Sequence, residues 1–583
     1  AAGIQHVVAR RDYLNAINVF PVPDGDTGTN IAFTLHAVLH AMTENMHRHA
    51  GRMLDVVAAA ALDGARGNSG AILAQFFQGL GEKTAALHDL SAAHFVAAVN
   101  HGAAAARTAL AQPMEGTLLT VLADFAAALQ GHLAQHHAAD ISSLLNTGLA
   151  RAKTSLANTP NQLQVLKQAG VVDAGAQGFV DLVQGIVDFL QAGSMEALPA
   201  DTILPMVSHE RGTEADSHYR YCTECLISGD NLERTVLSRE LAELGDSLVV
   251  AGGARKLRVH IHADGPDAVF RIAARYGQIS GEKADDMRRQ ARVAGRRLAR
   301  PAIITDSGAD IPEALRERLD IHMLPVRVHF GEHAYLDKVS LTPADFYREL
   351  RLNPLHPKTS QPPPGDFRRE FNFLASHYDA VVYIGLTSKV SGTVQAAVAA
   401  ANRADGTPVT VLDSGSVSAG QGLLAVYAAE CALAGYDAAA IVQAVKAMLP
   451  RTRIWGAIPD LSYAVRGGRV RRSTKLLADL LHLTPVLTAT PDGHVTSCGV
   501  LWGRNRRAEK FARFVTRHVN AHTRYRLLVG HCDCAEDAER LRTLLIRIPN
   551  IESSWLTEVG PALGTHAGPG ALVVSLQVNQ PVT

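Results

Sequence analysis

The chain has 583 residues, of which 47% are hydrophobic and 19% charged, and its formal net charge is zero. A chain of this length exceeds a single hydrophobic core and predicts about three domains. The charge balance lacks the basic excess typical of nucleic-acid-binding proteins, and no run of 18 or more apolar residues predicts a membrane span. Six cysteines do not make a disulfide framework and no signal-peptide pattern is present, so we expect a cytoplasmic protein.

The first region, residues 1–198, is rich in alanine, leucine and histidine. Its apolar residues recur at helical spacing, as in the segments 53–58 and 103–129. Four glycine-containing turns interrupt this pattern. We expect an all-helical domain, and a polar loop that contains Pro199 and Pro205 marks its end.

The second region, residues 205–298, has a mixed pattern. The segments 247–251 and 257–262 alternate as strands do, and residues 267–276 are typical of a helix. A basic helix over residues 285–300 is predicted to lead into the next region. We therefore expect a small α+β middle domain.

The third region, residues 300–583, alternates short apolar strands with helices. The strands are expected at residues 302–305, 380–384 and 409–412. This order predicts an α/β domain with polar loops at the ends of its strands. The whole chain is thus predicted to be multidomain, with an all-α, an α+β and an α/β part.

Two carboxylates, Asp24 and Asp26, lie in a turn rich in proline and glycine. A calcium-binding EF-hand loop starting at Asp24 is excluded, because its sixth and twelfth positions would be Thr29 and Leu35 instead of glycine and glutamate. One alternative is structural, with the aspartates forming an Asx-turn or a helix N-cap. The other is that they are ligands for a hard cation such as Mg²⁺.

Three further glycine-containing turns favour the second alternative. The segments 66–70, 115–120 and 173–178 each precede an apolar helical run. The N-terminus of such a helix presents backbone N–H groups and a positive dipole end to an anion. Carboxylates for Mg²⁺ beside several such helix starts are suited to ATP. The chain has no Gly-x-x-x-x-Gly-Lys-Ser/Thr motif and no protein-kinase glycine loop.

The segments 18–30, 65–73, 116–117 and 171–178 together resemble the ATP-binding domain of bacterial fatty acid kinase, which is related to the nucleotide-binding L subunit of dihydroxyacetone kinase. The resemblance implies an α-helical barrel that holds ATP and two Mg²⁺ ions. It implies Asp24, Asp26 and Asn18 as the ligands of Mg²⁺. The residues that it places around the nucleotide are Thr27, Gly28, Thr29, Asn30, Asn68, Ser69, Gly70, Gly116, Thr117, Asp173 and Gly175.

The second region contains a Cys222-Thr223-Glu224-Cys225 motif and, further on, His260-Ile261-His262. Alternation along a strand places His260 and His262 on one face, where both imidazoles can reach one ion. Thiolates and imidazoles suit zinc, whereas the alternative is that these side chains only pack. The region resembles the middle domain of the same kinase, which implies a metal site, with Zn²⁺ as the candidate, at Cys222, His260 and His262. The role of Cys225 stays open.

In the third region, turns with several hydroxyl groups are predicted after strands at residues 358–362, 386–393 and 413–416. Each can also be a capped helix or a glycine turn. The segment 301–580 resembles the DegV family of fatty-acid-binding proteins. That resemblance implies an apolar tunnel for the acyl chain and a carboxylate held by Thr359, Ser391, Gly392, Arg469 and His566; Arg466 stands where the family has lysine.

The resemblances together imply a fatty acid kinase fused to its fatty-acid-binding partner. The implied reaction transfers the γ-phosphate of ATP to a bound fatty acid and gives acyl phosphate, with Asp24, Asp26, Arg469 and His566 as catalytic residues. They also imply a homodimer and transient contact with a membrane or an acyltransferase. The alternatives are a kinase for a small hydroxyl substrate of the dihydroxyacetone type and a non-catalytic lipid carrier or sensor.

Overall fold

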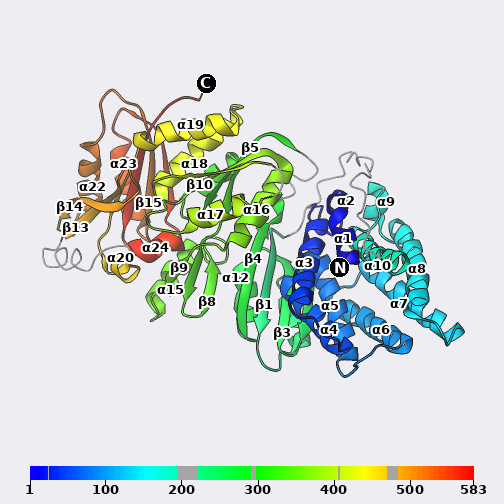
Figure 1. Cartoon of the computed structure of the whole chain (residues 1–583). Helices are drawn as coiled ribbons and strands as arrows, with labels where there is room; N and C mark the ends of the chain where they lie inside the picture. The colour runs from blue at the N-terminus through cyan, green and yellow to red at the C-terminus, as the bar shows by residue number, and fades with distance from the viewer. Residues whose placement is uncertain are drawn as a thin grey trace. The chain divides into compact units, whose positions relative to one another are not determined.

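The computed structural model describes residues 1–23, 25–193, 219–289, 297–404, 407–468, 483–503 and 505–582. The chain divides into two compact units, residues 1–295 and 296–583 (Figure 1). The first unit contains both the helical and the mixed region of the sequence, and the second contains the α/β region. The proposed limits of three domains, 1–198, 205–298 and 300–583, stay a prediction.

The N-terminal part of the first unit is helical, as predicted. Large apolar side chains fill its centre: the ring of Phe179 lies 5.9 Å from that of Phe76 and 5.3 Å from that of Phe125, both edge-on. The helices are α1 (Ala2–Ala9), α2 (Arg11–Ala16), α3 (Thr27–Glu44), α4 (Ala50–Gly64), α5 (Gly67–Thr84), α6 (Ala92–Thr108), α7 (Leu118–Gln135), α8 (Ile141–Gln162), α9 (Gln164–Ala169) and α10 (Ala174–Ala192).

The mixed region forms a four-stranded antiparallel sheet in the order β2-β3-β1-β4. Its strands are β1 (Tyr221–Ser228), β2 (Gly245–Gly253), β3 (Lys256–Ala263) and β4 (Gln278–Asp286). Helix α5 packs on β2 and β3, whereas α11 (Arg234–Leu241) contacts β2 and α12 (Pro266–Ala274) contacts β1 and β4. Every residue of β3 after Lys256 is buried, so both faces of this strand are covered.

The predicted basic helix over residues 285–300 is wrong at both ends. Asp285 and Asp286 belong to β4, where they pair with Cys222 and Tyr221 of β1, and Leu298 begins the next strand. Long-range pairing with β1 thus overrides the local helical pattern. Residues 194–218, which include the predicted boundary loop with Pro199 and Pro205, lie outside the described residues.

Hydrogen bonds join the helical part and the sheet of the first unit. Gly252 of β2 donates its backbone N–H to the side-chain oxygen of Gln75 on α5, and Val250 donates to the carbonyl of Ala109. Lys256 forms an ion pair with Asp63, with 2.6 Å between Nζ and Oδ1. The buried partners satisfy backbone groups at the edge of the sheet, which ties β2 to the helices.

The described residues of the second unit form three sheets. The parallel one has the order β11-β10-β5-β6, and the predicted strands at 302–305, 380–384 and 409–412 lie in it. A six-stranded sheet, β14-β13-β12-β17-β15-β16, is antiparallel except at β15–β16, and a small antiparallel sheet has the order β8-β7-β9. Helix α18 (Ser418–Leu433) contacts both larger sheets and is almost wholly buried.

The strands of this unit are β5 (Leu298–Asp306), β6 (Ile321–Leu324), β7 (Arg327–Phe330), β8 (His333–Leu336), β9 (Lys358–Ser360), β10 (Tyr378–Gly385), β11 (Val409–Asp413), β12 (Thr452–Ala457), β13 (Leu483–Ala489), β14 (Val495–Trp502), β15 (Tyr525–His531), β16 (Ile551–Glu558) and β17 (Leu572–Val578). Its helices are α14 (Glu313–Arg318), α15 (Pro343–Leu352), α16 (Pro364–His377), α17 (Thr393–Ala401), α18, α19 (Ala438–Met448), α20 (Ser462–Arg466), α22 (Arg507–Thr516), α23 (Ala535–Leu545) and α24 (Pro561–Ala567).

One buried side chain joins the starts of two helices in the first unit. Asp173 accepts a 2.8 Å hydrogen bond from the backbone N–H of Ala176 in the first turn of α10 and another from the backbone N–H of Leu118, where α7 begins. The residue is 6% exposed. Burial raises the pKa of its carboxyl group to about 6, against the effect of the two backbone hydrogen bonds, which lower it.

This shift gives the stability of the first unit a defined pH dependence. Because the folded state holds the Asp173 proton more tightly than the unfolded state does, stability contributed by this group falls as pH rises from about 4 to about 6. In an Asp173→Asn variant that part of the pH dependence is expected to disappear. Urea unfolding across this pH range, followed by hydrogen exchange of α7 and α10, measures it, and an unchanged profile would contradict this role of Asp173.

Candidate functional site

The turn before α3 places Asp26 at the start of the helix. Asp26 is the N-cap residue of α3, yet its side chain makes no capping hydrogen bond to the helix, so the carboxylate is not used as a cap. Thr27 and Gly28 behind it are buried. Asn15 fixes Thr29, the residue that follows Gly28. Its side chain accepts from the backbone N–H of Thr29 over 3.0 Å and donates to the Thr29 hydroxyl over 2.9 Å.

The other predicted ligands of Mg²⁺ in this turn are Asp24 and Asn18. Asp24 lies outside the described residues. Asn18 is 5% exposed and lies in the segment between α2 and α3. Their roles as metal ligands stay predictions.

The second predicted turn is the start of α5. Gly67 has a φ of +59°, and a Cβ atom placed on it would lie 2.6 Å from the Nδ2 atom of Asn30, so both backbone conformation and space require glycine here. Asn30 on α3 is thereby in contact with this turn. The Oδ1 atom of Asn68 is buried and has no hydrogen-bond partner among the described residues, as expected of an atom that faces a ligand.

The N-termini of α5, α7 and α10 meet. A Cβ atom on Gly175 of α10 would lie 2.7 Å from the hydroxyl oxygen of Ser69 on α5 and 3.5 Å from the Cβ atom of Leu118 on α7. Gly116, with a φ of +80°, leads into Thr117, the N-cap residue of α7. Three positive helix ends lie at one place, next to Asn30 of α3, an arrangement whose dipoles favour an anion.

The structure therefore brings together most of the residues predicted to surround a nucleotide. Ser69, Gly175 and Leu118 are direct neighbours, and Asn30 contacts Gly67. The carboxylate of Asp173 accepts hydrogen bonds from the starts of α7 and α10, so it fixes these two helix starts relative to each other. Gly70 is packed against Thr34 of α3, where a Cβ atom would lie 2.6 Å from the threonine hydroxyl oxygen.

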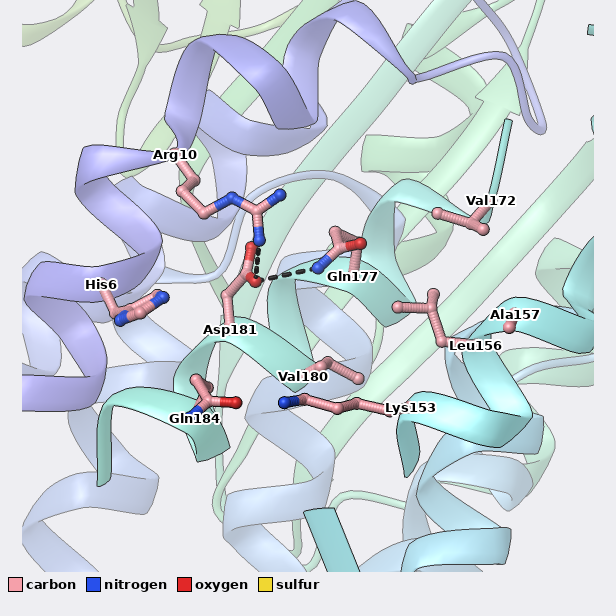
Figure 2. A pocket seen from close by; sticks show the side chains of 10 residues that line it. All are labelled: His6, Arg10, Lys153, Leu156, Ala157, Val172, Gln177, Val180, Asp181 and Gln184. Carbon is pink, nitrogen blue, oxygen red and sulfur yellow. Dashed lines mark hydrogen bonds and ion pairs between the residues drawn. The ribbon is translucent and has the colours of Figure 1, made fainter. Parts of the chain in front are cut away.

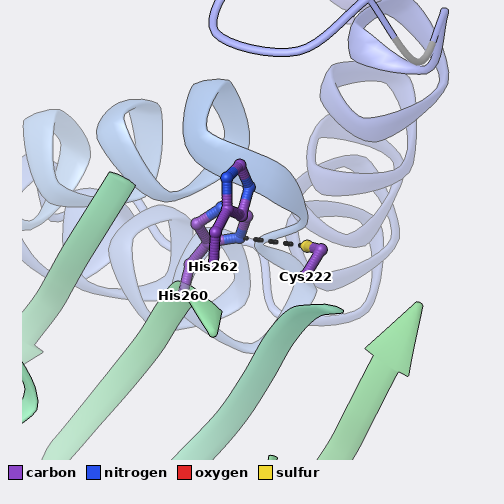
Figure 3. A group of neighbouring side chains, drawn as sticks. All are labelled: Cys222, His260 and His262. Atoms are coloured by element: carbon purple, nitrogen blue, oxygen red, sulfur yellow. Dashed lines mark hydrogen bonds between the residues drawn. The ribbon is translucent and has the colours of Figure 1, made fainter. Parts of the chain in front are cut away.

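Cys222, His260 and His262 also form a group, as predicted. Their candidate ligand atoms all lie within 4.8 Å of one another, and all three residues are buried. Figure 3 shows the thiol on β1 and the two imidazoles on β3 directed toward the helices of the same unit. The Nε2 atom of His260 is buried and has no hydrogen-bond partner among the described residues. A thiol and two imidazoles with such an atom fit a zinc ion.

Cys225 does not belong to this group among the described residues. It lies three positions after Cys222 on β1, so its side chain emerges on the opposite face of the sheet. Its thiol is buried, and burial raises its pKa to about 12. Cys225 therefore packs on the other face of the sheet from the cluster.

Sequence reasoning missed Glu224, which lies on the same face of β1 as Cys222. Its carboxylate is 1% exposed and accepts hydrogen bonds from Arg258, over 2.6 Å, and from the ring of His260, over 3.1 Å. It also accepts from the backbone N–H of Gly67, over 2.8 Å. Although burial alone would raise its pKa, the positive charges of Lys283 and Arg258 hold the pKa of Glu224 well below its usual range.

In the second unit, the structure brings together part of the predicted carboxylate site. The hydroxyl of Thr359 and the Nε2 atom of His566 lie 3.1 Å apart, although 207 positions separate the two residues. A Cβ atom on Gly392 would lie 2.0 Å from the side-chain oxygen of Gln361, so the start of α17 lies against the segment that follows Thr359. Ser391 forms a 2.6 Å hydrogen bond with Thr393.

The predicted turn at residues 358–362 begins as a strand. Lys358–Ser360 form β9, which pairs with β7, so Thr359 sits at the edge of a small sheet and not after a strand of the main one. The expected turns after β10 and β11 are present, and residue 469 lies outside the described residues. A Cβ atom on Gly467 would lie 2.2 Å from the Nδ1 atom of His566, so the turn that follows Arg466 lies beside this imidazole.

A separate pocket opens between α1, α8 and α10. It has a volume of about 310 Å³, and Figure 2 shows Arg10 and Gln177 both bonded to Asp181 within it. Burial raises the pKa of Asp181, against the effect of Arg10, which lowers it. None of the predicted site residues lines this pocket. The lining residues are His6, Arg10, Lys153, Leu156, Ala157, Val172, Gln177, Val180, Asp181 and Gln184.

Among the described residues, no helix is both long enough and apolar enough to cross a membrane.

Sequence comparisons agree with this arrangement of parts. Residues 21–188 match the model of the DAK2 domain, and residues 218–294 match that of the fatty acid kinase-like middle domain. Residues 300–579 match the DegV family, described as an uncharacterised protein family. The three matches follow one another along the chain.

Individual relatives match one half of the chain. Protein YloV from Bacillus subtilis is 34% identical over 304 residues, which are 50% of this chain and 54% of that protein. An uncharacterized protein from Staphylococcus aureus strain USA300 is 32% identical over 304 residues, with the same coverage. The chain thus spans about half the length of these relatives.

Two solved structures each match about half of the chain. DegV from Bacillus subtilis, described as a fatty acid binding protein, is 29% identical, with a TM-score of 0.45, and the match covers 48% of this chain and 100% of that one. A DegV family protein from Thermus thermophilus is 28% identical, with the same TM-score and coverage. By its three family matches, the chain combines a DAK2 domain, a fatty acid kinase-like middle domain and a DegV-family domain in one polypeptide.

Proposed function

We propose that this protein is a fatty acid kinase that transfers the γ-phosphate of ATP to the carboxylate of a bound fatty acid. The products are ADP and acyl phosphate. The observation that carries the proposal is the meeting of the N-termini of α5, α7 and α10 beside Asn30 and close to the start of α3. The three family matches support it, since they pair a kinase-type nucleotide domain with a DegV domain.

The chemistry requires positioning more than proton transfer. An oxygen of the fatty acid carboxylate attacks the γ-phosphorus, and the bond between this phosphorus and the bridging oxygen breaks, so ADP leaves with the electron pair. The carboxylate is already ionised and needs no base. The main barrier is therefore the repulsion between two anions, which preorganised dipoles and cations reduce.

The residues of the first unit supply part of that stabilisation. The backbone N–H groups of Asn68 and Ser69 belong to the first turn of α5, where no carbonyl of the same helix accepts from them. Asp26, whose side chain does not cap α3, would hold Mg²⁺ together with Asp24. When bound, Mg²⁺ neutralises charge on the phosphate oxygens.

The second unit would hold the fatty acid carboxylate. Thr359 and His566 present a hydroxyl and an imidazole nitrogen 3.1 Å apart, and the start of α17 lies next to this segment. Arg469 would add a positive charge. Because both parts belong to one polypeptide, the effective concentration of bound fatty acid near the kinase is raised to about the millimolar range if the linker can span the two sites.

Asp26→Asn is expected to reduce acyl phosphate formation by about 100-fold or more, since it removes one negative ligand of Mg²⁺. The assay incubates the purified chain with Mg·ATP and a long-chain fatty acid and traps acyl phosphate with hydroxylamine. The matched control is Asp12→Asn, which removes an exposed carboxylate that pairs with Arg11. Full activity in Asp26→Asn, or equal losses in the two variants, would refute the role given to Asp26.

Thr359→Val is expected to weaken fatty acid binding by about 10-fold or more, because a hydrogen bond to an ionised carboxylate is lost. Displacement of a fluorescent fatty acid measures the effect. Thr557→Val, a half-buried threonine on β16, is the control and should bind as the unmodified chain does. If Thr359→Val binds fatty acid normally, the carboxylate is held elsewhere.

A further inference from the structure

We propose that Glu224 is a positioning residue that couples metal binding at the Cys222–His260–His262 cluster to nucleotide binding at the first turn of α5. This inference rests on the proposed function, since it takes the first turn of α5 as part of the nucleotide site. The metal it concerns is a divalent cation that prefers thiolate and imidazole ligands, with Zn²⁺ as the probe.

The first link is the bond between Glu224 and His260. Because the Glu224 carboxylate is paired with Arg258 and offers only acceptor oxygens, the Nδ1 atom of His260, which also lies 3.8 Å from the Cys222 sulfur, donates in the 3.1 Å bond between them. The lone pair then resides on Nε2, the buried ring nitrogen without a hydrogen-bond partner among the described residues. A carboxylate behind a metal-binding histidine fixes the tautomer and the orientation of the ring.

The second link is the bond between Glu224 and Gly67. The same oxygen, Oε1, accepts the backbone N–H of Gly67 over 2.8 Å. Gly67 is the first residue of α5 and has the left-handed φ that sets the direction of the turn. One carboxylate oxygen therefore touches both a candidate metal ligand and the first amide of a helix that faces the proposed phosphates.

The surroundings bury this bridge and place positive charge beside it. Glu224 and Arg258 are 1% and 3% exposed, and their side chains form a 2.6 Å ion pair. Lys283, 5% exposed, lies 3.9 Å from Oε1 and only 2.8 Å from Asp285. These cations offset the cost of a negative charge near a phosphate site, so the carboxylate can stay ionised where it would otherwise repel the ligand.

A separate contact joins the metal cluster to the turn before α3. Val22, in the turn before α3, packs with Cys222 and Met287 in a small buried cluster. The turn proposed to hold Mg²⁺ and the thiol proposed to hold Zn²⁺ thus lie close enough to interact.

The expected coupling is positive. A metal bound at the cluster would fix the His260 ring and, through Glu224, the Gly67 amide, so less ordering would remain to be done when a nucleotide binds. By linkage, the factor by which Zn²⁺ tightens nucleotide binding equals the factor by which the nucleotide tightens Zn²⁺ binding. Couplings of this kind are about fivefold or larger.

The test measures the dissociation constant of a non-hydrolysable Mg·ATP analogue by calorimetry, with zinc-loaded chain and with chain freed of zinc by a zinc-selective chelator. We expect the zinc-loaded chain to bind at least about fivefold more tightly. In Glu224→Gln, the amide turns its N–H groups either toward Arg258 or toward the donors of Gly67 and His260, so one side of the bridge is lost. The ratio of the two dissociation constants should then fall below about twofold. Equal affinities with and without zinc in the unmodified chain would overturn the proposal.

Asp246→Asn is the matched control. Asp246 is the carboxylate beside the other histidine, with 3.6 Å between its Oδ1 atom and Nδ1 of His262, and it is 55% exposed. Both variants should weaken zinc binding by about 10-fold or more. Only Glu224→Gln should abolish the coupling. The proposal would also be refuted if Glu224→Gln kept the full zinc-dependent ratio of nucleotide affinities, or if Asp246→Asn lost it.

A second measurement needs neither a nucleotide nor a variant. Hydrogen exchange of the unmodified chain without nucleotide should show that zinc slows exchange in the peptide that spans residues 66–73, with little change in α8. Unchanged exchange there would overturn the coupling. If zinc slows exchange but no nucleotide binds under any condition, the proposed kinase function fails and the mechanical link from the cluster to α5 stands.

Discussion

The positive ends of helix dipoles repel one another, and the N-terminal half of this chain brings several of them to one place. Buried carboxylates oppose that repulsion. Asp173 accepts backbone N–H groups from the starts of α7 and α10, and Glu224 accepts the first N–H of α5. These bonds hold the three helix starts together, and the amides that the carboxylates do not occupy remain available to a polyanion.

The helix starts and the Cys222–His260–His262 cluster were predictable from the sequence, because each depends on residues that are close together in the chain or on alternation along one strand. Glycines with a left-handed φ, Gly67 and Gly116, mark the starts of α5 and α7, and the side chain of Asp173 caps α10. Alternation along β3 puts His260 and His262 on one face. The helix expected at residues 285–300 fails for the opposite reason. Pairing of β4 with β1 decides the structure there, and that pairing joins residues about 60 positions apart.

The contacts that make the sites are long-range and could not be predicted from spacing. Glu224 is visible in the sequence two positions after Cys222, and its side of β1 follows from alternation. Its partner Gly67, however, is 157 positions away, and Thr359 and His566 are 207 positions apart. Resemblance to known families supplied the residues of the carboxylate site, whereas the edge-strand position of Thr359 came only from the structure.

The central claim is that the nucleotide binds at the meeting point of α5, α7 and α10. A crystal structure of the chain with Mg²⁺ and a non-hydrolysable ATP analogue tests it most directly. The account predicts phosphate oxygens within hydrogen-bond distance of the backbone N–H groups of Asn68 and Ser69, with Mg²⁺ on Asp26. A nucleotide seated instead in the pocket between α1, α8 and α10, with its phosphates on Arg10 and Lys153, would contradict it.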